Sequence, residues 1–218
     1  MVIDSAAVLP ETIAQRLRAD IIGQKDAPGS SLTESAVALR FGVARPTARI
    51  AIDRLVADGL LRREAHRAAR VPELSRDDIL DLFATRSIVE AAAMGALAAA
   101  GTIPANALHA HRSLRSGSGS GSGSADFAHD DIRFHRALVA GQPSSRLTRM
   151  HELLMGEIEL CIGQVQSAQL ITAHEVADQH QGILDAITAG DAATAERLTR
   201  DHILGARDRL LTHLDSTN

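Results

Sequence analysis

The chain has 218 residues, enough for one large or two small domains, and its single cysteine, Cys161, excludes a framework of internal disulfides. Trp and Tyr are absent while Leu and Ala are abundant, which favours helices over sheets. Residues 1–72 carry 11 Lys and Arg against 8 Asp and Glu, and residues 73–218 carry 12 against 19. No apolar run reaches the roughly 20 residues that cross a bilayer, and the N-terminus lacks a signal-peptide pattern, so we expect a cytoplasmic protein without a membrane partner.

The basic part predicts an amphipathic helix over 11–22 and then a helix-turn-helix over 32–62. Thr33 is placed to cap the first helix of this pair, and Gly42 suits the left-handed conformation of a helix stop. The second helix carries a buried stripe at helical spacing. Facing away from that stripe, near the N-terminal end that enters the major groove in such folds, are three polar residues, Arg45, Thr47 and Arg49. This pattern indicates DNA binding, and an ordinary helical hairpin with a solvated basic edge is the alternative.

A pair of short strands is predicted next, over 60–63 and 68–71. The turn between them carries His66 and Arg67, as at the tip of the wing in a winged helix. We expect Thr33, His66 and Arg67 to contact the DNA backbone or the minor groove. Pro72 ends this unit, so residues 1–72 are predicted to form a winged helix-turn-helix domain.

The remainder, 73–218, predicts an all-helical antiparallel bundle of about six helices. The expected helices cover 75–100, 104–114, 126–140, 146–167, 173–189 and 192–214. Two of them open with capping boxes, Ser75 with Asp78 and Thr172 with Glu175. The repeat over 116–124 is a flexible Ser/Gly linker by composition, whether natural or engineered. The fold class is therefore mainly α.

Four polar residues interrupt the apolar stripes of three of these helices, and they are Asp131, His135, His180 and His202. A single buried histidine is more often a core residue with a satisfied hydrogen bond than a metal ligand. Four such residues together, one of them a carboxylate, are costly to bury unless they share a partner, and a divalent cation satisfies all of them. Imidazole and carboxylate ligands favour Zn or Ni, with Fe, Mn or Co as alternatives.

Arg86 also falls on an inward helix face, where its guanidinium needs a planar anion. We favour a small organic acid bound between the metal and Arg86, and an ion pair with Asp131 or Glu90 is the alternative. His151 lies on an apolar stripe, where core packing is favoured over a place at the pocket border. The other histidines are expected at the surface, and they are His66, His109, His111, His129, His174 and His213.

These residues resemble the GntR family of bacterial transcriptional regulators, in the branch with an all-helical FCD effector domain. The N-terminal resemblance lies in Leu32-Thr33-Glu34, Phe41-Gly42-Val43, the two arginines Arg45 and Arg49, and Asp58-Gly59-Leu60. The C-terminal resemblance lies in Asp131-Ile-Arg-Phe-His135, His180, Asp201-His202, and Arg86 followed by Glu90. The family usually has Glu where this chain has Ile50. The resemblance implies a homodimer that responds to a ligand, with a metal held by the Asp and three His that helps to bind a carboxylate effector.

The sequence thus predicts a regulator, not an enzyme, that binds a palindromic double-stranded operator as a homodimer and releases or keeps it in response to a small carboxylate. Two alternatives use the same residues. In one, the metal is a structural element of a DNA-binding dimer, and in the other a bundle-type metalloenzyme activates a water molecule at the metal.

Overall fold

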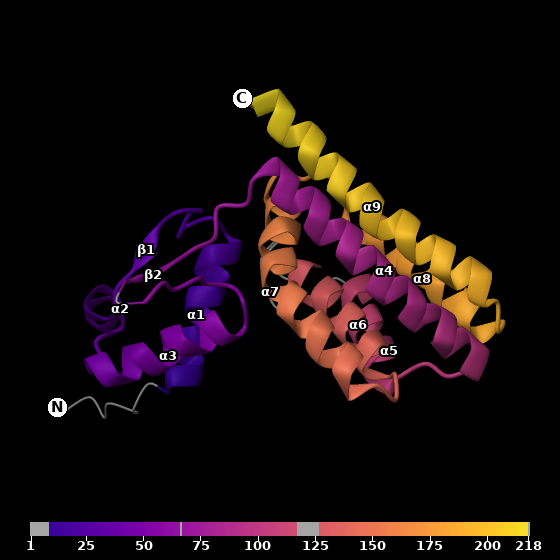
Figure 1. Cartoon of the computed structure of the whole chain (residues 1–218), viewed down its shortest axis with the longest axis horizontal. Helices are drawn as coiled ribbons and strands as arrows, with labels where there is room; N and C mark the ends of the chain where they lie inside the picture. The colour runs from indigo at the N-terminus through magenta and orange to yellow at the C-terminus, as the bar shows by residue number, and fades with distance from the viewer. Residues whose placement is uncertain (1–8, 66, 117–126, 218) are drawn as a thin grey trace. The chain divides into compact units, whose positions relative to one another are not determined.

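The computed structural model describes residues 9–65, 67–116 and 127–217 (Figure 1). His66 and nearly all of the predicted linker at 116–124 lie outside these residues. The chain divides into two compact units, Met1–Glu73 and Leu74–Asn218. Among the described residues there are nine helices and one two-stranded sheet, which confirms the mainly α class.

The first unit has three helices and a small antiparallel sheet. These elements are α1 (Pro10–Ile22), β1 (Ser31–Leu32), α2 (Glu34–Phe41), α3 (Arg45–Ala57) and β2 (Ala69–Arg70). Strand β1 pairs with β2 in the register Ser31 to Arg70 and Leu32 to Ala69. Both α1 and α2 pack on α3 through fully buried apolar side chains that include Leu17, Ile52 and Leu55.

Local chemistry sets the two ends of α2. The Thr33 hydroxyl accepts a hydrogen bond from the Ala36 amide at 3.1 Å, so Thr33 is the N-cap. Gly42 ends the helix with a φ of 64°, a left-handed conformation that favours glycine. Helix α3 begins three residues later, at Arg45, with Pro46 in its first turn, where the missing amide costs no helical hydrogen bond. The helix-turn-helix is therefore confirmed as a local structure.

The predicted wing is found in part, because the segment 68–71 contains β2 but 60–63 does not form a continuous strand. The Leu60 and Leu61 amides both donate back to the Leu55 carbonyl, at 3.0 and 3.1 Å, so these residues complete the end of α3. Only Arg62 reaches the sheet, through an isolated bridge to Arg70. The principal partner of β2 is β1, which precedes the helix-turn-helix and was not predicted.

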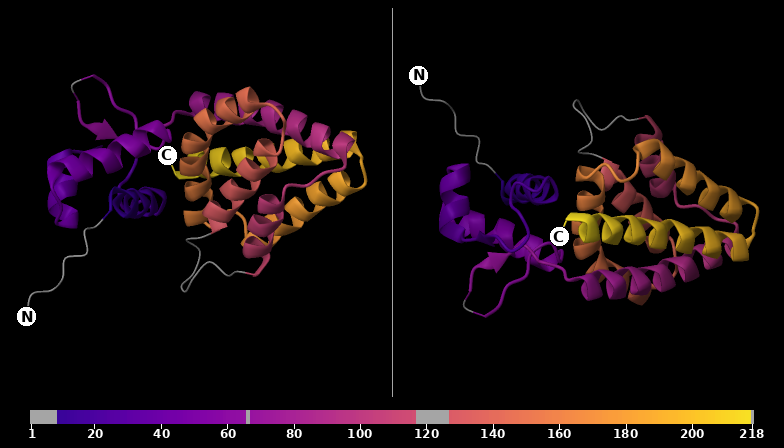
Figure 2. Two further views of the ribbon diagram at one scale, coloured as in Figure 1. Left: turned by 90° about the horizontal axis from the view of Figure 1, so that it is seen from below. Right: turned by 90° about the horizontal axis from the view of Figure 1, so that it is seen from above.

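The described part of the second unit is a helical bundle (Figure 2), and its helices number six, as predicted. They are α4 (Arg76–Ala100), α5 (Ala105–Ser116), α6 (Phe127–Ala140), α7 (Ser145–Ser167), α8 (Ala173–Thr188) and α9 (Ala192–Thr217). Both capping boxes are present, at Ser75 and at Thr172. Helices α4 and α9 lie side by side along the bundle. Helix α4 is long and apolar enough to span a membrane, but 61% of its apolar window is buried within the protein, as in a core helix.

Polar side chains form a layer between two apolar clusters of this bundle. One cluster holds Phe83, Ile132 and Ile203, and the other holds Met94, Phe134 and Ile183. Between these levels, five helices contribute buried polar residues, namely Arg86 and Glu90 on α4, Asp131 and His135 on α6, His151 on α7, His180 on α8 and His202 on α9. The layer is a candidate site because burying so many polar groups is costly without partners.

Candidate metal and ligand site

The four predicted ligands converge at the centre of the polar layer. Asp131 and His135 lie one turn apart on α6, and each of the four residues offers a ligand atom within 4.8 Å of the others. Asp131 Oδ1 lies 3.2 Å from His180 Nε2, 3.7 Å from His135 Nε2 and 3.8 Å from His202 Nε2. The Nε2 atoms of His135 and His202 are 3.1 Å apart. One oxygen and three nitrogens therefore surround a common point.

Neighbouring side chains orient two of the imidazoles. Gln179 Oε1 lies 2.7 Å from His202 Nδ1, and Glu90 Oε2 lies 2.5 Å from His135 Nδ1. An acceptor at Nδ1 favours the tautomer with its proton there and leaves the lone pair of Nε2 directed at the centre. The His180 ring stacks on Phe134 with centroids 3.8 Å apart, which fixes its plane. Ring orientation in this layer is thus set by packing, by a hydrogen bond at His202 and by the ion-pair contact of His135 with Glu90.

The protonation states suit a cation. Burial lowers the pKa of His180 to about 4, and burial, with nearby His180 and His135, lowers the pKa of His202 well below its usual range. Burial alone would raise the pKa of Asp131, but the nearby His135 and His180 rings lower it well below its usual range. Burial opposes protonation of His135, yet the Glu90 charge raises its pKa. Near neutral pH the site therefore holds one carboxylate and at least two neutral imidazoles, the forms that bind metals.

Unsatisfied atoms and spacing both fit a metal ion. Asp131 Oδ2 and both ring nitrogens of His180 are buried without a hydrogen-bond partner among the described residues. Metal bonds of about 2.1 Å place neighbouring ligand atoms about 3.0 Å apart at right angles and about 3.4 Å apart in a tetrahedron. The observed separations of 3.1 and 3.2 Å lie in this range, and the longer ones lie just outside it. His135, His180, His202 and Asp131 would hold a divalent cation here, which would supply a Lewis acid to a bound anion.

Arg86 is fully buried beside this centre. Its Nε donates to Glu90 Oε1 at 2.7 Å, so the alternative of an ion pair with Glu90 is confirmed. This bond uses one edge of the guanidinium only. The terminal Nη1 and Nη2 atoms have no hydrogen-bond partner among the described residues, although both are buried. Arg86 therefore retains the two donors that bind a carboxylate bidentately.

A small cavity of about 10 Å³ borders the centre. Asp131 and His202 form one wall, and Ile162, Val165 and Ala206 contribute apolar surface. Such a volume holds about one water molecule. The site has room for an additional small ligand beside the four side chains only if neighbouring side chains move.

Two histidines differ from the sequence-based expectations. His111, expected at the surface, is only 4% exposed, and its Nε2 lies 3.1 Å from Gln181 Oε1. His151, for which core packing was favoured, is buried and also belongs to the polar layer, because its Nε2 lies 2.9 Å from Glu90 Oε1. Glu90 was named only as a partner for Arg86. The one available signal was its spacing of four residues from Arg86, in a stretch of α4, 88–100, that is otherwise apolar.

The predicted DNA contacts lie on the first unit. Arg45 and Thr47 lie in the first turn of α3, and Arg45 is exposed. Arg49 follows one turn later, with its Nε 3.8 Å from Glu34 and 3.6 Å from Asp53. Arg67 is exposed and forms an ion pair with Glu64. Thr33 is the N-cap of α2, and His66 lies outside the described residues.

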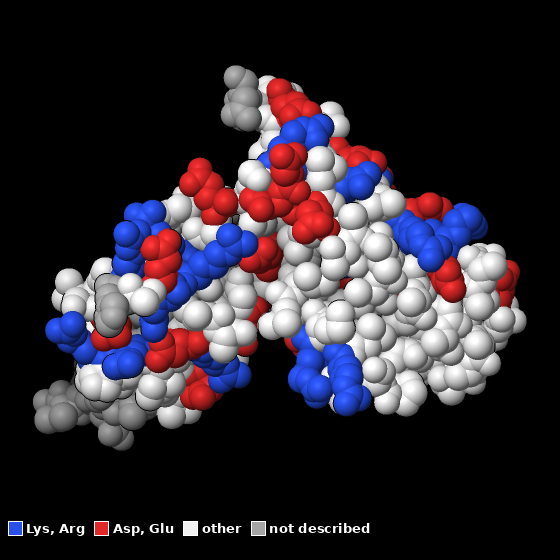
Figure 3. Space-filling view, in the orientation of Figure 1, with Lys and Arg blue, Asp and Glu red and all other residues white. Residues whose placement is uncertain are grey.

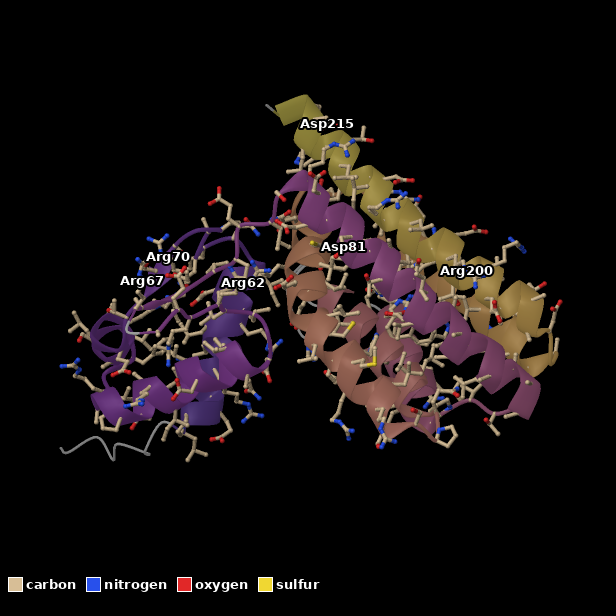
Figure 4. All side chains as sticks on the ribbon, in the orientation of Figure 1. Arg62, Arg67, Arg70, Asp81, Arg200 and Asp215 are labelled. Carbon is tan, nitrogen blue, oxygen red and sulfur yellow. The ribbon has the colours of Figure 1, made fainter. Side chains whose placement is uncertain are left out.

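Two further arginines that were not singled out from the sequence lie beside Arg67. An open hollow at the sheet is lined by Arg62, Arg67 and Arg70 (Figure 4), together with Gly29 and the acidic residues Glu64 and Glu73. Arg70 Nε donates to the Ser31 hydroxyl at 3.1 Å. Basic side chains gather over β1 and β2 in the space-filling view (Figure 3). Side chains alternate between the two faces of a strand, so the predicted strands 60–63 and 68–71 could have placed Arg62 and Arg70 on the same face of the wing.

A winged helix-turn-helix followed by an all-helical bundle with a buried polar centre defines a class, the two-domain transcriptional regulators of bacteria. Residues 9–71 match the family described as bacterial regulatory proteins, gntR family, and residues 81–205 match the FCD domain. The chain belongs to the GntR family, in the branch that carries an FCD domain.

Known relatives agree with this assignment over nearly the whole chain. A Paenarthrobacter nicotinovorans protein, described as a "probable D-xylose utilization operon transcriptional repressor", is 29% identical over 203 residues, 88% of this chain and 86% of that protein. The transcriptional repressor GlaR of Escherichia coli (strain K12) is 29% identical over 197 residues, 86% of this chain and 89% of GlaR. A structure of a GntR regulator from Rhodococcus sp. RHA1 has a TM-score of 0.71 at 24% identity and covers 93% of this chain and 97% of its own. The protein is a DNA-binding transcriptional regulator and not an enzyme.

Proposed function

We propose that the helical unit binds a divalent cation through Asp131, His135, His180 and His202, and a small organic acid through Arg86. The acid then changes the affinity of the winged helix-turn-helix for its operator. The proposal rests on one observation above all: four buried ligand atoms surround a point beside an arginine whose Nη1 and Nη2 lack partners among the described residues. Zn and Ni are the preferred ions for such ligands, with Fe, Mn or Co as alternatives.

On the DNA side, we assign base contacts to the N-terminal half of α3. Arg45, Thr47 and Arg49 would reach bases or phosphates in the major groove. Thr33 and the wing residues Arg67 and His66 would contact backbone or minor groove, and Arg62 and Arg70 would add phosphate contacts. The net positive charge of residues 1–72 supports this assignment.

The relatives support repression as the mode of action, since two of them are described as repressors. We propose a homodimer in the cytoplasm that reads a palindrome with one winged helix-turn-helix for each half-site. The acid must bind one arrangement of the dimer more tightly than another, since a ligand with equal affinity for both states shifts nothing.

The DNA part is tested by changing Arg45. Duplexes are first selected from a random pool by the full-length protein. Arg45→Ala should then weaken binding to the selected duplex at least tenfold, because a bidentate arginine contact contributes about 1–3 kcal/mol. Arg16→Ala is the matched control, since it removes the same charge from an exposed position on α1. Equal affinity of Arg45→Ala and the wild type would show that Arg45 does not read the operator.

The ligand part is tested with the metal-loaded protein and a panel of small carboxylic acids. An acid that binds should raise the melting temperature and change operator affinity, and Arg86→Gln should abolish both effects while the metal stays bound. If the protein retains its metal but no acid changes its affinity for the operator, the metal has a purely structural role. Absence of bound metal in the wild type would refute the cation site itself.

A further inference from the structure

Glu90 occupies the junction between the two halves of the proposed site. Its carboxylate is fully buried and contacts three side chains from three helices. Oε1 accepts from Arg86 Nε at 2.7 Å and lies 2.9 Å from His151 Nε2. Oε2 lies 2.5 Å from His135 Nδ1. One carboxylate thus contacts both the proposed acid-binding arginine and a proposed metal ligand.

The two oxygens serve different neighbours. The contact with His135 Nδ1 orients the opposite nitrogen, Nε2, toward Asp131 and His202. The bond to Arg86 Nε fixes the guanidinium, while its two terminal nitrogens have no partner among the described residues and can bind an anion. A shift of the carboxylate toward one neighbour must change its contact with the other, because all three side chains are closely packed and buried.

We propose that Glu90 is a positioning residue that couples the cation to the acid-binding arginine. It orients His135 for the metal and Arg86 for the acid, so that each ligand alters the affinity for the other. This inference rests on the proposed function and adds to it the route by which the two ligands influence each other. Such coupling is reciprocal by thermodynamic necessity.

The first experiment measures the affinity for Zn(II) of metal-free protein by competition with a chelating dye. Glu90→Gln keeps the shape and one acceptor but removes the charge, and it should weaken Zn(II) binding about 10- to 100-fold, as for other partners of metal-bound histidine. Glu159→Gln is the matched control, because Glu159 is a buried glutamate on α7 whose Oε2 lies 4.0 Å from Arg136. Its Zn(II) affinity should equal that of the wild type.

The second experiment tests the shared role without any knowledge of the acid. Arg86→Gln should change Zn(II) affinity at least threefold in the wild-type background, because it releases Glu90, and should have no effect in the Glu90→Gln background. The absorption spectrum of bound Co(II) should shift with Glu90→Gln, which a merely structural substitution would not cause. If Glu90→Gln does not fold, as judged by circular dichroism, Glu90→Asp replaces it, since it keeps the charge but withdraws it from His135.

The outcomes separate the two levels of the proposal. Wild-type affinity in Glu90→Gln, or equal effects of Arg86→Gln in both backgrounds, would overturn the coupling while the metal site stands. A wild-type protein that binds neither Zn(II) nor Co(II) would overturn the metal site, and the coupling with it.

Discussion

Single residues decide which ring nitrogen of each histidine is directed at the centre of the polar layer. His202 Nδ1 has a hydrogen-bond partner in Gln179 and His135 Nδ1 has a charged neighbour in Glu90, whereas both nitrogens of His180 lack a hydrogen-bond partner among the described residues. His180 is held by stacking on Phe134 instead. Its Nε2 lies 3.2 Å from Asp131 Oδ1. A metal at the centre would therefore provide His180 Nε2 with the partner that it lacks among the described residues.

Replacement of His180 therefore tests the metal site at the level of one residue. His180→Ala should lower the metal bound per chain at least tenfold, because one of four ligands is lost, and should leave the fold of the winged helix-turn-helix intact. Mass spectrometry of the dialysed protein measures the metal. His174→Ala on the same helix is the control, since that side chain is 81% exposed and does not belong to the four convergent residues. Full metal retention by His180→Ala would remove His180 from the site.

The same histidine predicts how the stability of the metal-free protein depends on pH. The pKa of His180 is lowered to about 4, so the unfolded chain binds its proton more readily than the folded one. The free energy of unfolding should then fall as the pH is lowered from 6.5 toward 4, by about 3 kcal/mol, and His202 acts in the same direction. The raised pKa of His135 opposes this loss, because protonation of His135 stabilises the folded protein below pH 6.5.

Urea unfolding of the metal-free protein at pH 7, 5.5 and 4.5 measures this dependence. His180→Gln should flatten the curve, because glutamine does not titrate. A wild-type stability that stays constant or increases toward pH 4.5 would mean that the effect of His135 outweighs that of the other two histidines.

Whole elements explain why the sequence predicted the centre of the site better than its surroundings. Helices α6, α8 and α9 have one buried face, so a polar residue within an apolar stripe is visible, and Asp131, His180 and His202 were found in this way. Helix α4 is buried on most of its circumference, with Ser87, Glu90 and Ala91 inside as well as the predicted stripe. No periodicity distinguishes an inward position on such a helix, so the contacts of Glu90 with His135 and His151 could not be predicted.

The pairing of β1 with β2 was missed for a related reason. The predicted strand 68–71 contains β2, but the two-residue β1 has no alternation to detect, and its pairing with β2 joins residues 31 and 70 across the whole helix-turn-helix. The helix-turn-helix itself was predictable because its signals are local, the Thr33 cap, the Gly42 stop and the buried stripe of α3.

The exposed face of α3 carries a prediction about base specificity. Ile50 is 55% exposed and lies one turn after Pro46, on the side opposite the buried residues Ala48 and Ile52. An apolar side chain on a helix in the major groove can contact the methyl group of thymine. We expect replacement of one thymine of the selected operator by deoxyuridine to weaken wild-type binding about fourfold, near the 0.8 kcal/mol of one buried methylene.

Ile50→Ala should bind the thymine and deoxyuridine duplexes equally well at that position. Leu39→Ala serves as the control, because Leu39 is 86% exposed but lies on α2. If the wild type shows no difference between thymine and deoxyuridine at any position, Ile50 does not read a methyl group.

At the scale of the whole molecule, the chain has two units with separate cores, and the polar layer lies entirely within the second. A metal that binds the folded helical unit and not the unfolded chain should stabilise it by about 4 kcal/mol at a free concentration one thousand times its dissociation constant. The first unit contributes none of the four ligands, so the metal alone should leave its local stability unchanged. The metal and the acid therefore have separable effects, since only the acid is proposed to alter DNA binding.

Hydrogen exchange followed by mass spectrometry distinguishes these effects by location. Addition of Zn(II) to metal-free protein should slow amide exchange in α6, α8 and α9, which supply the ligands, and leave exchange in α1 and α3 as it was. His180→Ala, exposed to Zn(II) in the same way, should show little added protection. Equal protection of both units by Zn(II) would contradict the separation, because it would mean that the cation stabilises the DNA-binding unit without any acid.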